Sequence, residues 1–404
     1  MAHFPSPPSW ARELRTVGVT GTNGKTSTTR WVAAALRAMN RGPVVRVTTV
    51  GAFLDDEPLN VDETYDGFLA AMDAGRSRGG SLAAIEVTSE VLALGFVHAW
   101  PVEVAVFTNL SHDHLDAHRS AEHYLASKAQ LFMHLPPNGA AVLNAFDPAS
   151  ALIREVVPEG VRVVTYGAPS RGERIETASV DLRASSVRVS WEGPEVELAP
   201  NDELALPRVI TMRAIGEIYA ENALAALGGA ISIGANAASA AAAIGAAPPP
   251  EGRFEVVARD PHVVVDYAHS PDALARTLRT ARGLTRGELV VVFGAGGNRD
   301  ATKRAAMGEA ARGADRVILT SDNPRDEDPA AIAAAIREGL AGHRAVDVVI
   351  DRAEAIALAI REAKADDVIV VAGKGHEVTQ TVAGATRSMR DRELARDAHA
   401  LRRA

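Results

Sequence analysis

Apolar residues in the first part of the chain come in short runs that alternate with stretches of helical spacing. The runs predict buried strands at residues 14–20, 44–50, 81–87 and 102–108, with helices at 27–39 and 67–78. Strands that alternate with helices are typical of a parallel sheet with right-handed crossovers, in which ligands bind at the carboxyl ends of the strands. Three loops that follow predicted strands, at 21–26, 86–90 and 109–116, should therefore meet at one edge.

The pattern changes between residues 160 and 207. Short alternating or β-branched runs at 161–166, 184–191 and 195–198 predict antiparallel additions to the sheet. The alanine-rich stretch 216–244 is predicted to be helical, and it ends before a run of three prolines, which cannot continue a helix.

A second alternating pattern begins after the prolines. It predicts strands at 263–266, 288–293, 316–320, 346–350 and 367–372, separated by helices of roughly 12–16 residues. The predicted fold is α/β: a P-loop central domain with a mostly parallel sheet, plus a smaller Rossmann-like C-terminal domain. The predicted boundaries are a short extension at 1–13, a central domain at 14–247 and a C-terminal domain at 248–404.

The first strand runs into a glycine-bracketed turn that predicts a phosphate site. The turn consists of Gly21, Thr22, Asn23 and Gly24, followed by Lys25 and Thr26 at the start of a helix. Such a turn directs backbone N–H groups into one concavity, and the helix adds the positive end of its dipole. The lysine adds a compact charge, and the hydroxyl is placed for Mg²⁺. The spacing differs from the usual pattern, because Val19 stands where the first glycine is expected. We expect ATP or a close relative to bind.

Composition narrows the class of protein. The chain has 404 residues and no cysteine, which excludes disulfides and thiolate metal sites. A net charge of -8 argues against a general nucleic-acid binder. No apolar stretch reaches the roughly 18–20 residues that span a bilayer, and the proline-rich opening is unlike a signal peptide, so the expected location is cytoplasmic.

Lysine is rare, and its positions are informative. Of 43 basic residues only five are lysines, at positions 25, 128, 303, 364 and 374. Lysine differs from arginine in being a compact ammonium that can lose its proton and react. Four of the five fall inside motifs that carry chemistry. From the pattern alone, however, Lys128 on its predicted helix would be a solvated surface residue.

Acidic and histidine side chains gather beside the phosphate turn. Residues 109–116 contain two histidines and two aspartates, and Glu86 ends a neighbouring strand. A carboxylate, an imidazole and phosphate oxygens suit a Mg²⁺ ion that keeps several waters.

These residues, together with Lys128, resemble the Mur ligases, a family of ATP-dependent amide ligases. The resemblance continues in elements at 252–255 (Gly-Arg-Phe-Glu), 266–274, 294–304, 322–325 (Asp-Asn-Pro-Arg) and 373–377 (Gly-Lys-Gly-His-Glu). In this order the series is most similar to the MurE-type branch, which adds the third residue of the peptidoglycan stem peptide. The resemblance covers roughly residues 14–395.

The resemblance implies a mechanism and its residues. An acceptor carboxylate takes the γ-phosphoryl group of ATP to form an acyl phosphate, and the amine of an amino acid then displaces phosphate. ATP and two Mg²⁺ ions are implied as cofactors, with Lys128 carbamylated by CO₂ to serve as a metal ligand. The implied roles are phosphate and metal binding for Lys25 and Thr26, metal binding for Glu86 and His114, and contacts to adenine, phosphate and ribose for Asn222, Arg253 and Asp266.

The same resemblance implies an amino acid with a charged distal end. Arg325 would face a distal carboxylate, for which a fork-shaped guanidinium is suited, and Glu377 would face a distal ammonium. The other implied substrate-binding residues are Asp322, Asn323, Gly373, Arg299 and Lys303.

The chain departs from the MurE-type pattern where the acceptor should bind. Only about thirteen residues precede the first predicted strand, so we expect the amino-terminal UDP-binding domain to be missing. Residues 59–65 lack the family's Thr-Thr-Pro element, Glu90 replaces a histidine, and the arginine expected near 95–98 is absent. Tyr219 replaces the first asparagine of the pair that ends at Asn222. We expect an acceptor that is unlike or smaller than UDP-MurNAc-dipeptide, or one that a separate protein presents.

Other functions stay open. The chain could be a genuine MurE-type peptidoglycan ligase, an ATP-binding subunit that does not ligate, or a small-molecule kinase that stops at the acyl phosphate. The Asp-Asn-Pro-Arg element disfavours a folylpolyglutamate synthase, and the length disfavours cyanophycin synthetase. The absence of cysteine disfavours the amidotransferase-partner branch, which carries a zinc ribbon.

Overall fold

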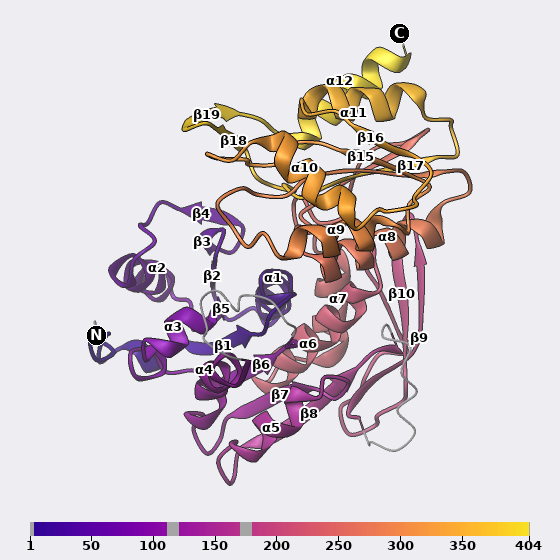
Figure 1. The fold of residues 1–404 in the computed structure, drawn as a ribbon. Coiled ribbons are helices and arrows are strands. Elements are labelled where there is room, and N and C mark those ends of the chain that lie inside the picture. The colour runs from indigo at the N-terminus through magenta and orange to yellow at the C-terminus, as the bar shows by residue number, and fades with distance from the viewer. Residues whose placement is uncertain (1–3, 111–120, 170–179, 404) are drawn as a thin grey trace. The chain divides into compact units, whose positions relative to one another are not determined.

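The computed structural model describes residues 4–110, 121–169 and 180–403, which form two compact units. The first unit comprises Met1–Arg188, Pro194–Arg213 and Glu217–Ala247. The second unit comprises Val189–Gly193, Ala214–Gly216 and Pro248–Ala404. In each unit, helices pack on a sheet whose central strands are parallel (Figure 1).

The first unit is built on one large sheet. Its strands, in the described part of the chain, are β1 (Arg15–Thr20), β2 (Val44–Thr48), β3 (Gly51–Leu54), β4 (Glu57–Leu59), β5 (Leu82–Glu86), β6 (Val104–Phe107), β7 (Ala140–Asn144), β8 (Arg162–Gly167), β9 (Leu182–Ser190), β10 (Gly193–Leu198) and β11 (Val209–Thr211). Their order is β11-β10-β9-β8-β7-β6-β1-β5-β2-β3-β4. From β9 to β2 every neighbouring pair is parallel, whereas β3 and β4 extend one edge in antiparallel fashion.

Part of the sequence prediction for residues 160–207 was wrong. Strand β8 is parallel to β7 and β9 is parallel to β8, whereas β10, which follows β9 after two residues, and β11 show the expected antiparallel arrangement. The orientation of β8 was mispredicted because its parallel partner β7 was not among the predicted strands. A parallel neighbour needs a crossover, and helix α5 (Ala149–Glu155) between β7 and β8 supplies it.

Helices cover both faces of this sheet. One face carries α1 (Lys25–Arg37), α6 (Ile218–Ser232) and α7 (Ala237–Ala246). The other carries α5 with α2 (Tyr65–Ser77), α3 (Ser89–Ala93) and α4 (Ala121–Met133), and short 3₁₀ turns lie at Ala11–Glu13 and Phe96–His98. The alanine-rich stretch is two helices, because Gly234 adopts a left-handed conformation (φ 101°) and Asn236 caps the second helix.

The second unit has its own sheet, as predicted. Its strands are β12 (Glu255–Ala258), β13 (His262–Asp266), β14 (Leu289–Phe293), β15 (Arg316–Leu319), β16 (Val346–Val348) and β17 (Val368–Ala372), and a separate hairpin is formed by β18 (Thr379–Val382) and β19 (Ala385–Ser388). The order in the sheet is β12-β13-β17-β14-β15-β16, and among the described strands of this sheet β12 alone is antiparallel to its neighbour. The five strands that the sequence predicted for this domain are all present.

The helices of the second unit are α8 (Pro271–Leu284), α9 (Lys303–Ala311), α10 (Pro329–Glu338), α11 (Arg352–Glu362) and α12 (Asp391–Arg403). Helices α8, α9 and α10 form one layer, and α11 and α12 form the other. Every residue of β14 and β17 is buried, as expected for a parallel sheet covered on both sides. No helix among the described residues is long and apolar enough to cross a membrane.

Candidate functional site

In the first unit, the carboxyl end of β1 leads into the predicted phosphate loop. Gly24 caps α1 in a left-handed conformation (φ 86°), and the first turn of the helix contains no acidic residue. The positive end of the helix dipole at this position favours an anion. The Lys25 ammonium lies over this loop and donates to the Thr22 carbonyl at 2.9 Å.

Two residues after β6 brace the loop. The Asn109 side chain accepts from the Asn23 N–H at 2.9 Å and donates to the Asn23 carbonyl at 3.0 Å. The Thr108 hydroxyl donates to the same carbonyl at 2.7 Å. These three hydrogen bonds hold the backbone of the loop at Asn23. Thr108 had no part in the sequence prediction, although its place after a buried strand beside the loop could have indicated one.

Glycine is required at both ends of the loop. A Cβ on Gly21 would lie 1.9 Å from the Thr108 hydroxyl oxygen, and one on Gly24 would lie 2.3 Å from Asn222 Oδ1. Asn222 comes from α6 and is buried. The structure therefore places this predicted adenine contact directly beneath the phosphate loop.

The predicted metal-binding oxygens lie together. The Thr26 hydroxyl donates to Glu86 Oε2 at 2.9 Å, and the same oxygen accepts from the backbone N–H of Thr49 at 3.3 Å. A hydroxyl and a carboxylate in contact beside a phosphate loop form a donor set that suits Mg²⁺. His114, the other predicted ligand, lies outside the described residues.

Lys128 is buried, contrary to what its helical pattern alone suggests. Its side chain is 1% exposed, its ammonium donates to the Gly21 carbonyl at 2.8 Å, and it lies 4.2 Å from the centre of the Tyr124 ring. Burial, and then the nearby charge of Lys25, lower the pKa of Lys128 to about 6. An uncharged amine at neutral pH is a nucleophile, which an exposed lysine is not.

In the second unit, the loops after β13, β14, β15 and β17 gather at one edge of the sheet. Asp266, at the end of β13, accepts from the Phe254 N–H at 2.7 Å, the Ala268 N–H at 3.0 Å and the Thr277 hydroxyl at 2.8 Å. Asp266, the predicted ribose contact, is therefore buried, and its hydrogen bonds hold the neighbouring backbone at this edge of the sheet.

An aromatic cluster, made of Tyr267, His269 and His376 with Arg253, lies next to Asp266. The Arg253 guanidinium is 4.3 Å from the centre of the Tyr267 ring, and the centres of the Tyr267 and His376 rings are 4.9 Å apart. Burial, followed by the Glu377 carboxylate, raises the pKa of Tyr267. Burial, followed by the Arg253 charge, lowers the pKa of His376. Both rings are thus uncharged at neutral pH.

The Asp-Asn-Pro-Arg element follows β15. Arg325 has a left-handed backbone (φ 52°), and its guanidinium donates to the Gly297 carbonyl at 2.7 Å. Asn323 donates to Glu377 Oε2 at 2.8 Å and accepts from the Thr381 N–H at 3.0 Å, which ties the loop to the β18–β19 hairpin.

The remaining predicted substrate residues surround this element. Gly373 has φ 114°, and a Cβ there would lie 2.5 Å from Asp322 Oδ2. Lys303 donates to the His269 carbonyl at 3.1 Å, whereas Arg299 is exposed on the loop after β14. The structure thus brings Asp322, Asn323, Arg325, Gly373 and Glu377 together on two loops, those after β15 and β17, with Arg299 on the loop after β14 and Lys303 at the start of α9.

A braced glycine loop at a helix N-terminus, with a hydroxyl and a carboxylate beside it, defines the first unit as an α/β domain of the phosphate-binding class. Comparison with known proteins extends this conclusion to both units. The Mur ligase middle domain matches residues 19–230, and the Mur ligase glutamate ligase domain matches residues 252–375. The chain belongs to the Mur ligase family. It is an ATP-dependent, ADP-forming acid–amino-acid ligase, of a family that uses Mg²⁺.

Individual relatives agree with this assignment. The UDP-N-acetylmuramoyl-L-alanyl-D-glutamate–2,6-diaminopimelate ligase of Bacillus velezensis is 37% identical over 396 residues, which are 95% of this chain and 78% of the relative. The enzyme of the same name from Ralstonia nicotianae is 39% identical over 96% of this chain and 76% of its own length. These MurE-type relatives confirm the predicted resemblance.

Solved structures also agree. The structure of a ligase with that name has a TM-score of 0.68 at 32% identity, covering 97% of this chain and 79% of the other. A folylpolyglutamate synthase of Mycobacterium tuberculosis has a TM-score of 0.70 at 22% identity, with 90% of this chain and 89% of the other covered. The latter likeness concerns the fold alone.

Proposed function

We propose that this ligase joins an amino acid of the diaminopimelate type to a carboxylate acceptor through an acyl phosphate. The distal end of such an amino acid carries both a carboxylate and an ammonium. One observation carries the proposal: Asn323 bridges a guanidinium and a carboxylate at one sheet edge. Its side-chain amide donates to Glu377, and its backbone carbonyl accepts from the Arg325 guanidinium at 3.5 Å. A distal carboxylate suits the arginine, and a distal ammonium suits the glutamate.

The phosphate loop supports the activation half of the reaction. An anionic acceptor must approach an anionic triphosphate, so the site has to place positive charge at the transferring group. The N–H groups of the loop and the Lys25 ammonium are suited to this task. Thr26 and Glu86 would hold Mg²⁺, which when bound neutralises charge on the phosphates.

Lys128 supports a further ligand for the metal. Its uncharged amine would add to CO₂, forming a nitrogen–carbon bond and releasing one proton, to give a carbamate. The carbamate oxygens are acceptors like those of a carboxylate, and Mg²⁺ prefers such ligands. The roles of Asn222, Arg253 and Asp266 in binding the nucleoside stay proposals that follow from the family resemblance.

We also propose an acceptor other than UDP-MurNAc-dipeptide. Where the family has its acceptor-binding Thr-Thr-Pro element, this chain exposes Asp62 and Glu63, and the Thr64 hydroxyl caps α2 by accepting from the Gly67 N–H at 3.1 Å. In the family this element grips the sugar-peptide of the acceptor, and the acidic segment offers different chemistry at the same place. We therefore infer an acceptor that is smaller than or unlike UDP-MurNAc-dipeptide, or one that a separate protein presents.

The first test measures ADP release with and without each of a panel of amino acids, in the presence of extract from the source organism as an acceptor pool. We expect release that depends on diaminopimelate and is much weaker with lysine or glutamate. ADP release that ignores the amino acid would indicate a kinase that stops at the acyl phosphate. No release with any combination would indicate an ATP-binding subunit.

The second candidate function is that of the MurE-type relatives, which the identity of 36–39% to enzymes of that name favours. Mass spectrometry of the products separates the two. Formation of the UDP-MurNAc-tripeptide from purified UDP-MurNAc-dipeptide, at a rate comparable with that of any other acceptor, would overturn our proposal about the acceptor. The proposal about the amino acid would be unaffected.

A further inference from the structure

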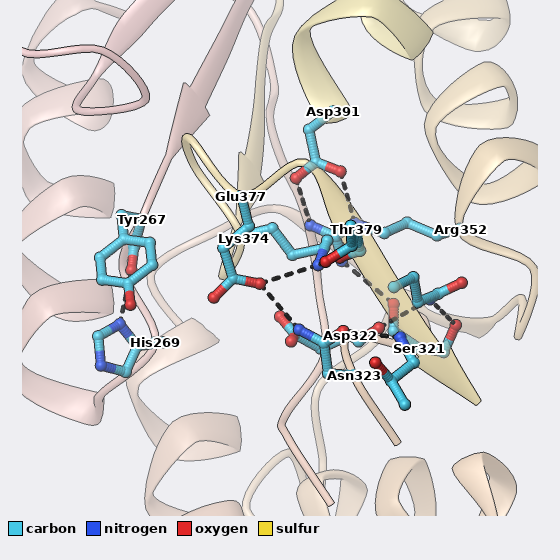
Figure 2. Close-up of polar contacts among 12 residues, drawn as sticks. Tyr267, His269, Ser321, Asp322, Asn323, Arg352, Lys374, Glu377, Thr379 and Asp391 are labelled. Atoms are coloured by element: carbon cyan, nitrogen blue, oxygen red, sulfur yellow. Dashed lines mark hydrogen bonds and ion pairs between the residues drawn. The ribbon is translucent and has the colours of Figure 1, made fainter. Parts of the chain in front are cut away.

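One lysine of the second unit has no surface exposure. Lys374 follows β17, and its side chain is 0% exposed. Its ammonium donates to Glu377 Oε2 at 2.9 Å and to the Thr379 carbonyl at 2.6 Å (Figure 2). A buried ammonium needs such partners because its desolvation is costly. The Lys374 ammonium thus forms an ion pair with Glu377, three positions further along the chain.

The same carboxylate oxygen is held from a second side. The Asn323 amide, which comes from the loop after β15, donates to Glu377 Oε2 at 2.8 Å. The other carboxylate oxygen points away from both donors (Figure 2). The Glu377 side chain is 35% exposed, so this oxygen is the part that a ligand can reach.

The frame around Lys374 is rigid and buried. Arg352 pairs with Asp391 at 2.7 Å, and both side chains are 0% exposed (Figure 2). The same guanidinium donates to the Ala372 carbonyl at 2.9 Å, two residues before Lys374. Gln380, also fully buried, donates to the Asp322 carbonyl at 2.7 Å and so fixes the neighbouring loop. Lys374 therefore sits between two loops whose backbones are independently anchored.

Two of the carboxylates in this group have a cation as partner: Glu377 pairs with Lys374, and Asp391 pairs with Arg352. Other guanidinium groups lie close by, since Arg387 donates to Gln380 at 2.7 Å and Arg325 to the Asn323 carbonyl at 3.5 Å. The outward-facing oxygen of Glu377 would attract a cationic group of a ligand and repel an anionic group placed directly against it.

We propose that Lys374 is a positioning residue for the distal ammonium of the amino acid. It fixes Glu377 through one oxygen, so that the other oxygen is presented to the substrate. This role rests on the proposed function, because it takes a distal ammonium as the group that Glu377 binds. Without Lys374, the partly exposed Glu377 side chain can turn towards water, and the site loses its preference for the distal ammonium of the amino acid.

The test compares two amino acids that differ only in the distal amine: diaminopimelate and 2-aminopimelate. We expect the Lys374→Met variant to lower the ratio of their kcat/KM values by about tenfold or more, the size of a lost contact to a charged group. The KM for ATP should stay within about twofold of the wild-type value. The matched control is Lys364→Met, an exposed lysine of the same unit, which should leave the ratio unchanged.

A double-mutant cycle shows whether Lys374 acts through Glu377. In a Glu377→Gln background, the Lys374→Met change should alter the ratio by less than about twofold, because the two residues work as one. An equally large effect in both backgrounds would overturn the proposal, since it would mean a general structural role.

Failure of the inference is distinguishable from failure of the proposed function. Wild-type enzyme that does not distinguish the two amino acids would contradict the proposed function. Wild-type enzyme that does distinguish them, with an unchanged ratio in Lys374→Met, would overturn the positioning role alone. If Lys374→Met does not fold, as judged by thermal melting, Lys374→Gln keeps a donor but removes the charge. It should lower the ratio by a smaller factor, and an unchanged ratio there also refutes the proposal.

Discussion

The environment of Lys128 determines how readily its amine can react with CO₂. With a pKa of about 6, the amine is uncharged in about 90% of molecules at pH 7, whereas an ordinary lysine near 10.5 is uncharged in about 0.03%. The reactive form is therefore about 3,000 times more abundant than at an exposed lysine. Because the folded-state pKa is lowered, this reactive form is lost as the pH falls through about 6.

Carbon-13 NMR with labelled CO₂ measures the consequence directly. Metal-free protein is held at pH values from 5 to 8 with the concentration of dissolved CO₂ kept constant, and the carbamate signal is integrated. We expect a single lysine carbamate whose signal falls as the pH is lowered from 8, because carbamate formation releases a proton, and falls more steeply below about 6, where the free amine is protonated as well. The Lys128→Met variant should show no signal, and Lys364→Met should behave like the wild type.

The absence of a carbamate signal at every pH from 5 to 8, or a signal that survives in Lys128→Met, would refute the reasoning. The first result would mean that burial does not neutralise this amine, and the second that another amine reacts. Activity provides a further check. Lys128→Arg cannot form a carbamate, so ligation should fall by more than about a hundredfold, the loss typical of a missing electrostatic contact to the reacting group. ATP affinity should change by less than about threefold.

Three other substitutions have expected effects of different kinds. Gly24→Ala should weaken ATP binding about tenfold or more in calorimetry, since it combines left-handed strain with a clash against Asn222; Gly79→Ala, with φ 83° and open space around it, is the control. Arg325→Ala should raise the KM for the amino acid about 10–100-fold and leave that for ATP nearly unchanged; equal effects on both would indicate misfolding. Arg352→Met should lower the free energy of unfolding by about 3–5 kcal/mol in urea titrations, because it leaves a buried carboxylate without its partner. A loss below about 1 kcal/mol would contradict that account.

Hydrophobic patterning predicted the fold well where strands are buried on both faces. Strands β14 and β17 are continuous apolar runs between helices, so their type and place follow from the sequence. Patterning failed at β7, a short apolar run of Ala-Ala-Val-Leu-Asn that resembles part of a helix. Missing that one strand also led to the wrong orientation for β8, because pairing direction is set by the connection and not by the strand itself.

The candidate site was predictable where a motif is continuous in sequence. The phosphate loop and the Asp-Asn-Pro-Arg element could be read directly, since their spacing reflects a local backbone shape. Contacts between distant segments could not be read this way. The prediction that the loops at 21–26 and 109–116 meet did not specify that Thr108 lies against Gly21, and nothing near Asn323 indicates that Glu377 accepts its hydrogen bond, 54 positions away. Such pairs depend on strand order, which is a property of the whole sheet.

The two fully buried lysines show why residue type alone does not define a role. Lys128 contacts a carbonyl and a ring, and the carboxylates that act on it, Glu90 and Glu86, have less influence than burial and Lys25, so its proton is lost. Lys374 contacts a carboxylate at 2.9 Å, so its charge is compensated where it stands. The first environment prepares an amine for covalent chemistry, and the second makes a fixed cation that orients its partner. Exchanging the partners would exchange the roles: a carboxylate placed beside Lys128 should restore its charge and abolish carbamate formation, with no change to the lysine itself.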